Sequence, residues 1–458
     1  MLELSSLRSY HRKVFNKGNG ELLYRCFAAH THYKDDQGTF QDIDTNLGYD
    51  DSSACFKHHK SSYHCAIPQY ADDWFEFYNA FEGVNHTIKA RPVVDHILGE
   101  VDGNKVIYHN AYGADTDLRV YAEWSGLKKV IVIKEKPSEI YDRYFDFELD
   151  LPETSKVINK ENIEWNKVID FPFTNDELKI GDDNKFSYFS QAEMWDSSQI
   201  PLREKVRIEL YVLNGITYLR KTVPATFLEK ATFPVYTDHP TTYVLNSFSG
   251  YILSDSANSF ADAYDGTAVM GSVAPYSGGG IYSGSYQFSP QWGIYRGFLF
   301  IDTSGIADTA TVTAATLYLG RAPGPGGASG CRIVGSTAVV HSLASTDWSL
   351  VDGAQLSDYI ADPNDGSNYF NYESFPFNAA GRTYINKTGY TKLAMREDYD
   401  LDGSPTADGV IYLCAWVGVT GFESDYGGSV TIGSYAPYLE VTTTGGEIIG
   451  PFPTFQLS

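Results

Sequence analysis

The chain has 458 residues, of which 43% are hydrophobic, so it holds enough apolar surface for packed cores and is not disordered throughout. Its 58 acidic and 35 basic residues give a formal net charge of −23 at pH 7. This negative balance argues against a nucleic-acid partner and against docking on an anionic membrane. Frequent Tyr (34), Phe (26) and Gly (41) favour strands and turns. We therefore expect an all-β, multidomain protein.

The N-terminal segment carries charges without an apolar run, so it does not resemble a signal peptide. The longest uncharged apolar stretch, Gly409 to Phe422, is too short for a membrane helix. Five cysteines are a sparse and odd number, unlike the count of a secreted disulfide scaffold. These features indicate a protein that folds in a reducing cytoplasm and does not insert into a membrane.

Two-residue alternation of apolar and polar side chains predicts strands over 145–151 and 206–212, each with one solvated face. Asn214-Gly215 follows the second of these strands and predicts a hairpin to the run 216–219, because both residues tolerate positive φ. Asp102-Gly103 is a second hairpin candidate. The strand expected near 296–302 is apolar on both faces, as in a strand buried between two sheets.

Composition divides the chain into modules. Lys and His are concentrated before residue 240, and Gly, Ser, Thr, Ala and Tyr dominate after it. We expect an N-terminal β-rich module over 1–115, a middle β-sandwich over 116–238 and a C-terminal β-sandwich over 239–446. Residues 447–458 are expected to form an extended apolar tail that contacts another subunit, which predicts a homo-oligomer such as a trimer; a disordered terminus is the alternative.

Asp398, Asp400 and Asp402 precede Gly403 with the D-x-D-x-D-G spacing of a calcium loop, in which alternate carboxylates converge on the ion. The twelfth position is Gly409 rather than Glu. A turn between strands, chosen for its Asp and Gly residues alone, is the alternative reading.

Cys26, His30, Cys55 and His58 could supply two pairs of zinc ligands, since Zn²⁺ takes about four sulfur or nitrogen ligands in tetrahedral geometry. Their spacing is not that of a standard zinc finger. Buried thiols and surface imidazoles are the alternative.

Trp292 and Tyr295 lie in a Gly- and Ser-rich region and are candidates for stacking on a glycan; packing within the sandwich or against a neighbouring subunit is the alternative. The standard catalytic signatures, including G-x-S-x-G, H-E-x-x-H and the P-loop pattern, do not occur. No pair of carboxylates stands out for glycoside hydrolysis. We therefore expect no catalytic activity.

Several segments, taken in chain order, resemble those of DNRLRE-domain proteins. His32 to Asp35 resembles their "HYKD" opening, and 296–304 resembles their "R-x-x-L-x-F-D-x-S" strand. The other matching segments are residues 106–110, 117–121, 126–132, 233–238, 312–319, 388–396 and 436–441. The resemblance implies that the C-terminal module is a jelly-roll-like β-sandwich.

Members of this family are secreted or surface-attached bacterial proteins, or parts of phage particles. Because the chain shows no export signal, the resemblance favours a phage virion structural protein, such as a decoration, fibre or tail-associated component made in the host cytoplasm. Its partners would be itself, other virion proteins and a host-surface glycan. An exported bacterial surface adhesin or carbohydrate-binding protein, extracellular or on the cell surface, is the alternative.

Overall fold

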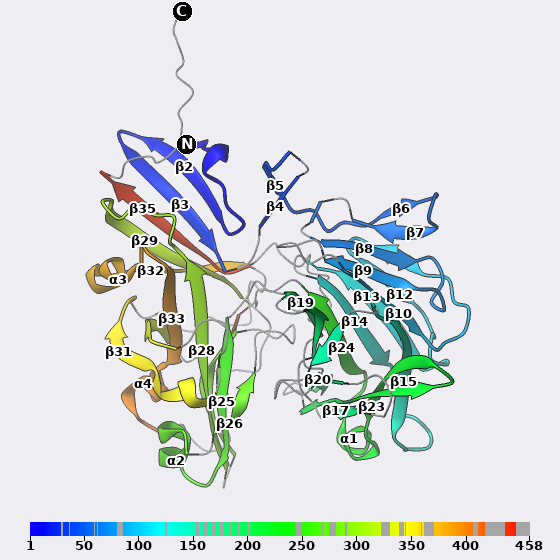
Figure 1. Cartoon of the computed structure of the whole chain (residues 1–458). Coiled ribbons are helices and arrows are strands. Elements are labelled where there is room, and N and C mark those ends of the chain that lie inside the picture. The colour runs from blue at the N-terminus through cyan, green and yellow to red at the C-terminus, as the bar shows by residue number, and fades with distance from the viewer. Residues whose placement is uncertain are drawn as a thin grey trace, which may run out of the picture. The chain divides into compact units, whose positions relative to one another are not determined.

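The computed structural model divides the chain into two compact units, and each is described by itself (Figure 1). The first unit comprises Met1–Phe40 and Ser247–Ser458, and the second comprises Gln41–Asn246. The structure describes residues 1–28, 31–35, 37–58, 60–61, 63–79, 86–123, 126–152, 155–158, 164–165, 171–173, 178–182, 185–189, 193–198, 202–243, 249–267, 269–273, 281–288, 291–321, 330–338, 343, 345–358, 360, 371–405, 411–416 and 436–445.

One sheet of the first unit contains strands from both ends of the chain. Its order is β1-β2-β3-β35-β29-β32. The strands are β1 (Leu2–Glu3), β2 (Arg12–Gly18), β3 (Glu21–Phe27), β29 (Thr311–Gly320), β32 (Tyr372–Pro376) and β35 (Tyr438–Thr444). Strand β35 pairs antiparallel with β3 on one side and with β29 on the other, as Figure 1 shows. Strand β3, near the beginning of the chain, therefore lies beside β35 in the middle of this sheet, and β1 is at the edge.

The second sheet of the first unit has the order β26-β25-β28-β33-β30-β31, and β27 joins β28 to β34. Its strands are β25 (Gly250–Ala257), β26 (Val269–Val273), β27 (Ile281–Phe288), β28 (Gln291–Asp302), β30 (Cys331–Ser336), β31 (Val351–Gln355), β33 (Tyr390–Glu397) and β34 (Ile411–Trp416). Apolar side chains of the two sheets form one core, in which Val14 and Leu439 of the first sheet join Leu299 and Ile301 of the second. This packing of two sheets is a β-sandwich.

Strand β28 is buried on both faces, as its sequence predicts. Leu299 and Ile301 point into the core between the sheets, whereas Phe298 and Phe300, also buried, lie on the opposite face. On that opposite face the first unit carries short helices. The helical elements of this unit are η1 (Ser5–Leu7), α2 (Phe260–Asp265), η3 (Ser345–Ser349), α3 (Ala379–Tyr384) and α4 (Asp398–Asp402). Contacts of α2 with β25 and β28 place it against this sheet.

The second unit is also built from two sheets. The nine-stranded sheet runs β17-β22-β23-β15-β10-β9-β8-β7-β6. The ten-stranded sheet runs β11-β12-β13-β14-β24-β19-β18-β16, and in addition β20 pairs with β24 and β21 pairs with β20. The strands of the nine-stranded sheet are β6 (Gly48–Asp50), β7 (Cys55–Lys57), β8 (Tyr63–Pro68), β9 (Phe75–Asn79), β10 (His86–Pro92), β15 (Arg143–Asp150), β17 (Phe171–Phe173), β22 (Arg207–Leu213) and β23 (Ile216–Val223).

The strands of the ten-stranded sheet are β11 (Glu100–Asp102), β12 (Lys105–Tyr108), β13 (Thr116–Ala122), β14 (Gly126–Ile133), β16 (Lys156–Ile158), β18 (Leu178–Asp182), β19 (Lys185–Phe189), β20 (Glu193–Asp196), β21 (Arg203–Lys205) and β24 (Val235–Tyr243). The two sheets share a single apolar core that includes Phe75 and Phe147 of one sheet and Leu118 and Ile131 of the other. Helix α1 (Ala225–Lys230) adds Phe227 to this core. Strands β4 (His32–Lys34) and β5 (Phe40–Asp42) pair where the chain passes from the first unit to the second.

The local predictions of strands and turns are confirmed. The strand expected over 145–151 is β15, and its burial alternates as the sequence does. Strands β22 and β23 form a hairpin around Asn214 and Gly215, whose φ values of 52° and 80° are the positive values that this turn requires. In the other hairpin Asp102 pairs with Lys105, so the turn residues are Gly103 and Asn104, one position later than expected.

The all-β sandwich fold is confirmed, but the units differ from the three expected modules. No boundary exists at residue 115, because β12, β13 and β14 are consecutive antiparallel strands of one sheet. A boundary at 238 would cut β24, which pairs with β14. Residues 1–40 belong with the C-terminal sandwich rather than with an N-terminal module. None of the helices that the structure describes is long and apolar enough to cross a membrane.

Candidate functional site

The segment expected to bind calcium is a short helix whose central carboxylate is already bound. Asp400 is fully buried in α4. Its oxygens accept hydrogen bonds from Arg296 at 2.7–3.2 Å and from Arg396 at 2.6 and 2.9 Å. Asp398 lies 3.7 Å from Arg332, and Asp402 is exposed. The geometry does not favour a calcium ion at Asp400, because two guanidiniums already bind its carboxylate oxygens, and the calcium site stays a prediction from the sequence.

The two arginines keep Asp400 ionised. Burial by itself raises the pKa of this carboxyl, but the charges and hydrogen bonds of Arg296 and Arg396 outweigh it and hold the pKa below its usual value. Arg296 also donates to the carbonyl oxygen of Trp348 at 3.0 Å and lies 4.0 Å from the centre of its ring. A second bond reaches the carbonyl oxygen of Tyr264 at 3.3 Å. This network fastens α2, η3 and α4 to strands β28 and β33, which is a structural role.

The described members of the four candidate zinc ligands are divided between the two units of the chain. Cys26 is in β3 of the first unit, whereas Cys55 and His58 are in the second unit. His30 lies outside the described residues. Burial raises the pKa of Cys26 to about 12, so its thiol is protonated and is a poor metal ligand. Among the residues that the structure describes, no group of three or more His, Cys, Asp or Glu side chains could hold a metal ion.

Trp292 and Tyr295 lie three positions apart on β28 and therefore point to opposite faces of the sheet. Trp292 packs edge-on against Phe260 of α2 at 5.6 Å. Tyr295 packs in a tyrosine cluster, within 5.6 Å of Tyr251 and 6.2 Å of Tyr286, measured between ring centres. The two residues cannot contact one glycan together, and their packing within the sandwich matches the alternative reading.

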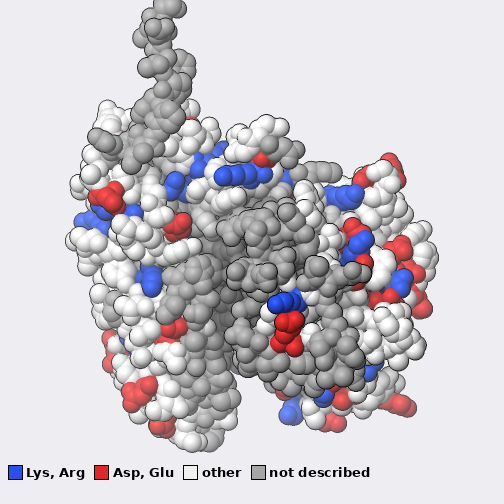
Figure 2. All heavy atoms as spheres, in the orientation of Figure 1, with Lys and Arg blue, Asp and Glu red and all other residues white. Residues whose placement is uncertain are grey.

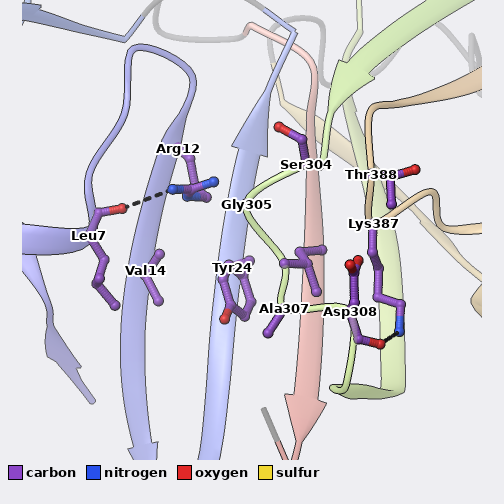
Figure 3. A pocket seen from close by; sticks show the side chains of 11 residues that line it. Leu7, Arg12, Val14, Tyr24, Ser304, Gly305, Ala307, Asp308, Lys387 and Thr388 are labelled. Atoms are coloured by element: carbon purple, nitrogen blue, oxygen red, sulfur yellow. Dashed lines mark hydrogen bonds between the residues drawn. The ribbon is translucent and has the colours of Figure 1, made fainter. Parts of the chain in front are cut away.

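A cavity of about 400 Å³ opens within the first unit (Figure 3). Three distant parts of the chain line it, namely the N-terminal segment, the loop after β28 and the loop before β33. The lining residues are Leu7, Arg12, Val14, Tyr24, Ser304, Gly305, Ile306, Ala307, Asp308, Lys387 and Thr388. Because this cavity combines an apolar floor with a few polar groups, it has the composition of a small-molecule site, and we refer to it as the hairpin cavity.

Gly305 determines where the guanidinium of Arg12 lies. A Cβ atom at position 305 would lie only 1.1 Å from Nη1 of Arg12, so only glycine leaves room for the guanidinium here. Arg12 Nη2 lies 3.4 Å from the carbonyl oxygen of Leu7, as Figure 3 shows. Its Nε atom is buried and has no hydrogen-bond partner in the described part of the chain. This N–H therefore lies behind the cavity wall, out of reach of a ligand in the cavity.

Lys387 supplies the second cation of the hairpin cavity. Its ammonium donates hydrogen bonds to the carbonyl oxygens of Asp308 and Ala310, the latter at 2.9 Å. Tyr24 is 5% exposed, and burial raises the pKa of its phenol, so the phenol is neutral at physiological pH. In the view of Figure 3 the Tyr24 ring lies between Arg12 and Lys387. The arrangement is suited to binding rather than to acid–base chemistry.

Sequence reasoning did not find the hairpin cavity. Its residues are separated by as many as 381 positions, from Leu7 to Thr388, and each is unremarkable in its own segment. The one local signal is the pair Ser304-Gly305 at the end of a predicted strand, where a glycine can mark a close approach of other groups. The partner in that approach, Arg12, could not be identified without the pairing of β3 with β35.

A second hollow, of about 730 Å³, lies in the second unit between 93–95, 111–115 and 141–145. Its charged pair is satisfied, because Arg143 donates to Asp115 at 2.9 Å and to the hydroxyl of Thr116 at 3.0 Å. Tyr141 and Tyr144 are more than half exposed at its edge. With its cation already paired, this hollow offers less to a ligand than the hairpin cavity.

Comparisons with known proteins add no relative to these observations. No family model matches the chain, and neither a curated protein nor a solved structure is significantly similar to it. The resemblance to DNRLRE-domain proteins therefore stays a prediction from the sequence.

Proposed function

We propose that this chain is a non-catalytic structural protein of a phage particle, with a C-terminal DNRLRE-like β-sandwich, that serves as a decoration, fibre or tail-associated component. The observation that carries the proposal is the pairing of β3 with β35, by which the first unit is closed by both ends of its chain. Terminal segments are usually where proteolysis and fraying start. Strands β3 and β35 are central to their sheet, and a full strand pair between such distant segments suits a protein that must stay folded outside a cell.

The cysteines support the proposed site of synthesis, the host cytoplasm. All five are free thiols, and Cys26, Cys65, Cys331 and Cys414 are buried. Exported proteins commonly use cysteine pairs as disulfides, whereas cytoplasmic proteins keep them reduced. A virion protein folds in the reducing cytoplasm and meets an oxidising medium only after assembly, and buried thiols tolerate that change.

The distribution of charge on the surface favours proteins, rather than nucleic acids, as binding partners. On the face that Figure 2 shows, the described basic side chains are scattered among acidic ones, and the net charge of the chain is −23. Nucleic-acid binding requires a concentrated basic surface. The proposed partners are other virion proteins and further copies of this chain, in a homo-oligomer such as a trimer. The tail proposed to mediate that contact, 447–458, lies outside the described residues.

Mass spectrometry of particles tests this proposal. Particles are purified on a density gradient from a lysate of the strain that carries the gene, and peptides of both units are quantified across the fractions. We expect them to follow the particle band at a constant ratio to the major capsid protein. Peptides confined to the cell-envelope or secreted fraction would instead support the alternative, an exported adhesin or carbohydrate-binding protein.

A further inference from the structure

Exposed apolar side chains gather at the hollow of the second unit, which has a volume of about 730 Å³. Val93, Tyr141 and Tyr144 line this hollow, and each is more than half exposed. Single apolar residues scattered over a surface need no explanation, but grouped ones commonly mark a site of interaction. Three of them around one hollow therefore indicate a surface that contacts another molecule.

The charged groups of this hollow leave a net negative charge. Arg143 is the one cation among the described lining residues, and Asp115 neutralises it at 2.9 Å. Asp142 accepts a hydrogen bond from the backbone N–H of Ala225 at 2.8 Å and keeps its charge. Asp95 forms no hydrogen bond or ion pair within the described part of the chain. Two carboxylates of the lining thus lack a cationic partner among the described residues, so the hollow repels anions and attracts cations.

Arginines of the chain itself show how a cation is held in this environment. Arg143, whose carboxylate partner is given above, has its guanidinium 5.8 Å from the centre of the Phe145 ring. Arg220 donates two hydrogen bonds of 2.7 Å to Asp146 and lies 5.1 Å from the ring centre of Tyr144. In both cases a guanidinium combines a carboxylate with an aromatic ring, which is the pairing that its planar shape favours.

The same combination is repeated at the open side of the hollow, where Asp95 and Asp142 line it together with Tyr141. A metal ion is not favoured, because the described residues include no group of three or more His, Cys, Asp or Glu side chains that could hold one. A neutral sugar can stack on a tyrosine but gains nothing from the net negative charge. An arginine side chain gains from both features, since its N–H groups pair with carboxylates and its flat face stacks on rings.

From these observations we propose that the hollow of the second unit is the docking site for an arginine side chain on the surface of a partner protein, with the guanidinium against Asp95 and Asp142 and its face over Tyr141. A partner with a basic surface fits this site, whereas a second copy of the chain carries the same net charge of −23. The inference goes beyond the proposed structural role and does not depend on it. Its test uses the purified chain alone, so its failure would leave the particle proposal untouched.

Ligand-observed nuclear magnetic resonance of the full chain at low ionic strength tests the proposal. The probes are the peptide acetyl-Gly-Arg-Gly-amide, the same peptide with neutral citrulline in place of arginine, and methyl glucoside. We expect saturable binding of the arginine peptide with a dissociation constant on the order of millimolar, and citrulline binding that is about tenfold weaker or undetectable, because its hydrogen bonds lack the charge. Equal binding of the two peptides would overturn the cation assignment. Methyl glucoside binding tighter than the arginine peptide would give the hollow to a neutral sugar, and no saturation at tens of millimolar would overturn the site.

Variants locate the binding. Asp95→Asn and Tyr141→Leu change exposed side chains, so the fold is retained, and each should weaken binding of the arginine peptide severalfold. Asp51→Asn and Tyr49→Leu are the matched controls, because they make the same changes at exposed positions of the second unit outside the hollow, and both should bind as the wild type does.

Equal weakening by Asp95→Asn and Asp51→Asn would show that the peptide responds only to the net charge of the chain, and would contradict the proposal. Unchanged binding by the two hollow variants would place the peptide elsewhere and contradict it as well. Sedimentation velocity of the same variants covers the remaining occupant: an oligomer that dissociates in Asp95→Asn or Tyr141→Leu but not in the controls would assign the hollow to a second copy of this chain and overturn the proposal.

Discussion

Arg25 and Glu440 form a salt bridge across 415 positions of sequence. The guanidinium donates two hydrogen bonds to one oxygen of the carboxylate, at 2.5 and 3.0 Å, and also lies 5.0 Å from the ring centre of Tyr438. Because both side chains are partly exposed, the pair contributes only about 0.5–1 kcal/mol. Its significance is positional: it marks the register in which β3 meets β35, while the apolar residues behind it supply most of the stability.

The first prediction concerns fragments. Residues 247–458 produced alone lack Val14, Leu22 and Tyr24, each of which contributes roughly 1.5–3 kcal/mol by burial in the core. They also expose the edge of β35. We expect this fragment to be protease-sensitive and to become resistant when residues 1–40 are co-expressed as a separate peptide. Size-exclusion chromatography and limited proteolysis measure this. A fragment 247–458 that is as resistant as the full chain would contradict the fold described here.

The second prediction concerns Asp400. Asp400→Asn leaves two buried guanidiniums without a negative partner, which should lower the free energy of unfolding of the first unit by about 3–5 kcal/mol. The control Asp402→Asn changes an exposed residue of the same helix and should have an effect near zero. Pulse proteolysis read from peptides of the first unit provides the measurement. EDTA should leave the unfolding of the wild-type chain unchanged, whereas a chelator-induced loss equal to that of Asp400→Asn would restore the calcium reading.

The third prediction is a pH dependence. The pKa of Asp400 is lowered in the folded protein, because Arg296 and Arg396 outweigh the effect of burial. The ionised Asp400 carboxylate therefore contributes its full stabilisation to the folded protein above the ordinary carboxyl pKa of about 3.9. This contribution is lost as the pH falls through the lower pKa that Asp400 has in the folded protein. We expect the stability difference between wild type and Asp400→Asn to be constant from pH 7 to about pH 5 and to shrink below about pH 4. A difference that grows on acidification would have the wrong sign.

The fourth prediction concerns the thiols. Cys55 is the only cysteine that is not buried, while burial raises the pKa of Cys26 and of Cys65 to about 12 and that of Cys331 well above its usual value. Because the thiolate is the reactive form, a disulfide reagent at pH 8 should modify Cys55 slowly in the native protein and all five cysteines after denaturation. Peptide mapping counts the modified sites. Rapid native modification of Cys26 would show that β3 does not stay in its sheet.

Strands and turns could be predicted from the sequence because their signals are local. The alternation around Phe147 and the positive φ required at Asn214 each depend on a few neighbouring residues. The change of composition near residue 240 likewise fell within a few residues of the junction at Asn246 and Ser247. The place of β3 could not be predicted, because its partner strand is more than 400 residues away and many antiparallel strands would fit its pattern equally well.

The candidate site shows the same limit. Aspartates at alternate positions before a glycine fit a calcium loop, a turn or a short helix ending in a left-handed glycine, and Gly403 has a φ of 63° in this helix. Arg396, four residues before Asp400, was a local sign of an internal ion pair. The second partner of Asp400, Arg296, is distant from it in the sequence. The segments that line the hairpin cavity are likewise distant from one another in the sequence.

The register of β3 and β35 also determines how the protein responds to force. Glu21 pairs with Thr444 and Phe27 with Tyr438, so the chain leaves the two strands at opposite ends of the pair. Tension between the segment after Phe27 and the segment after Thr444 pulls the strands along their length in opposite directions. Backbone hydrogen bonds of antiparallel strands lie across that direction. All seven paired positions are then loaded in shear at once, rather than opened one at a time as in an unzipped hairpin.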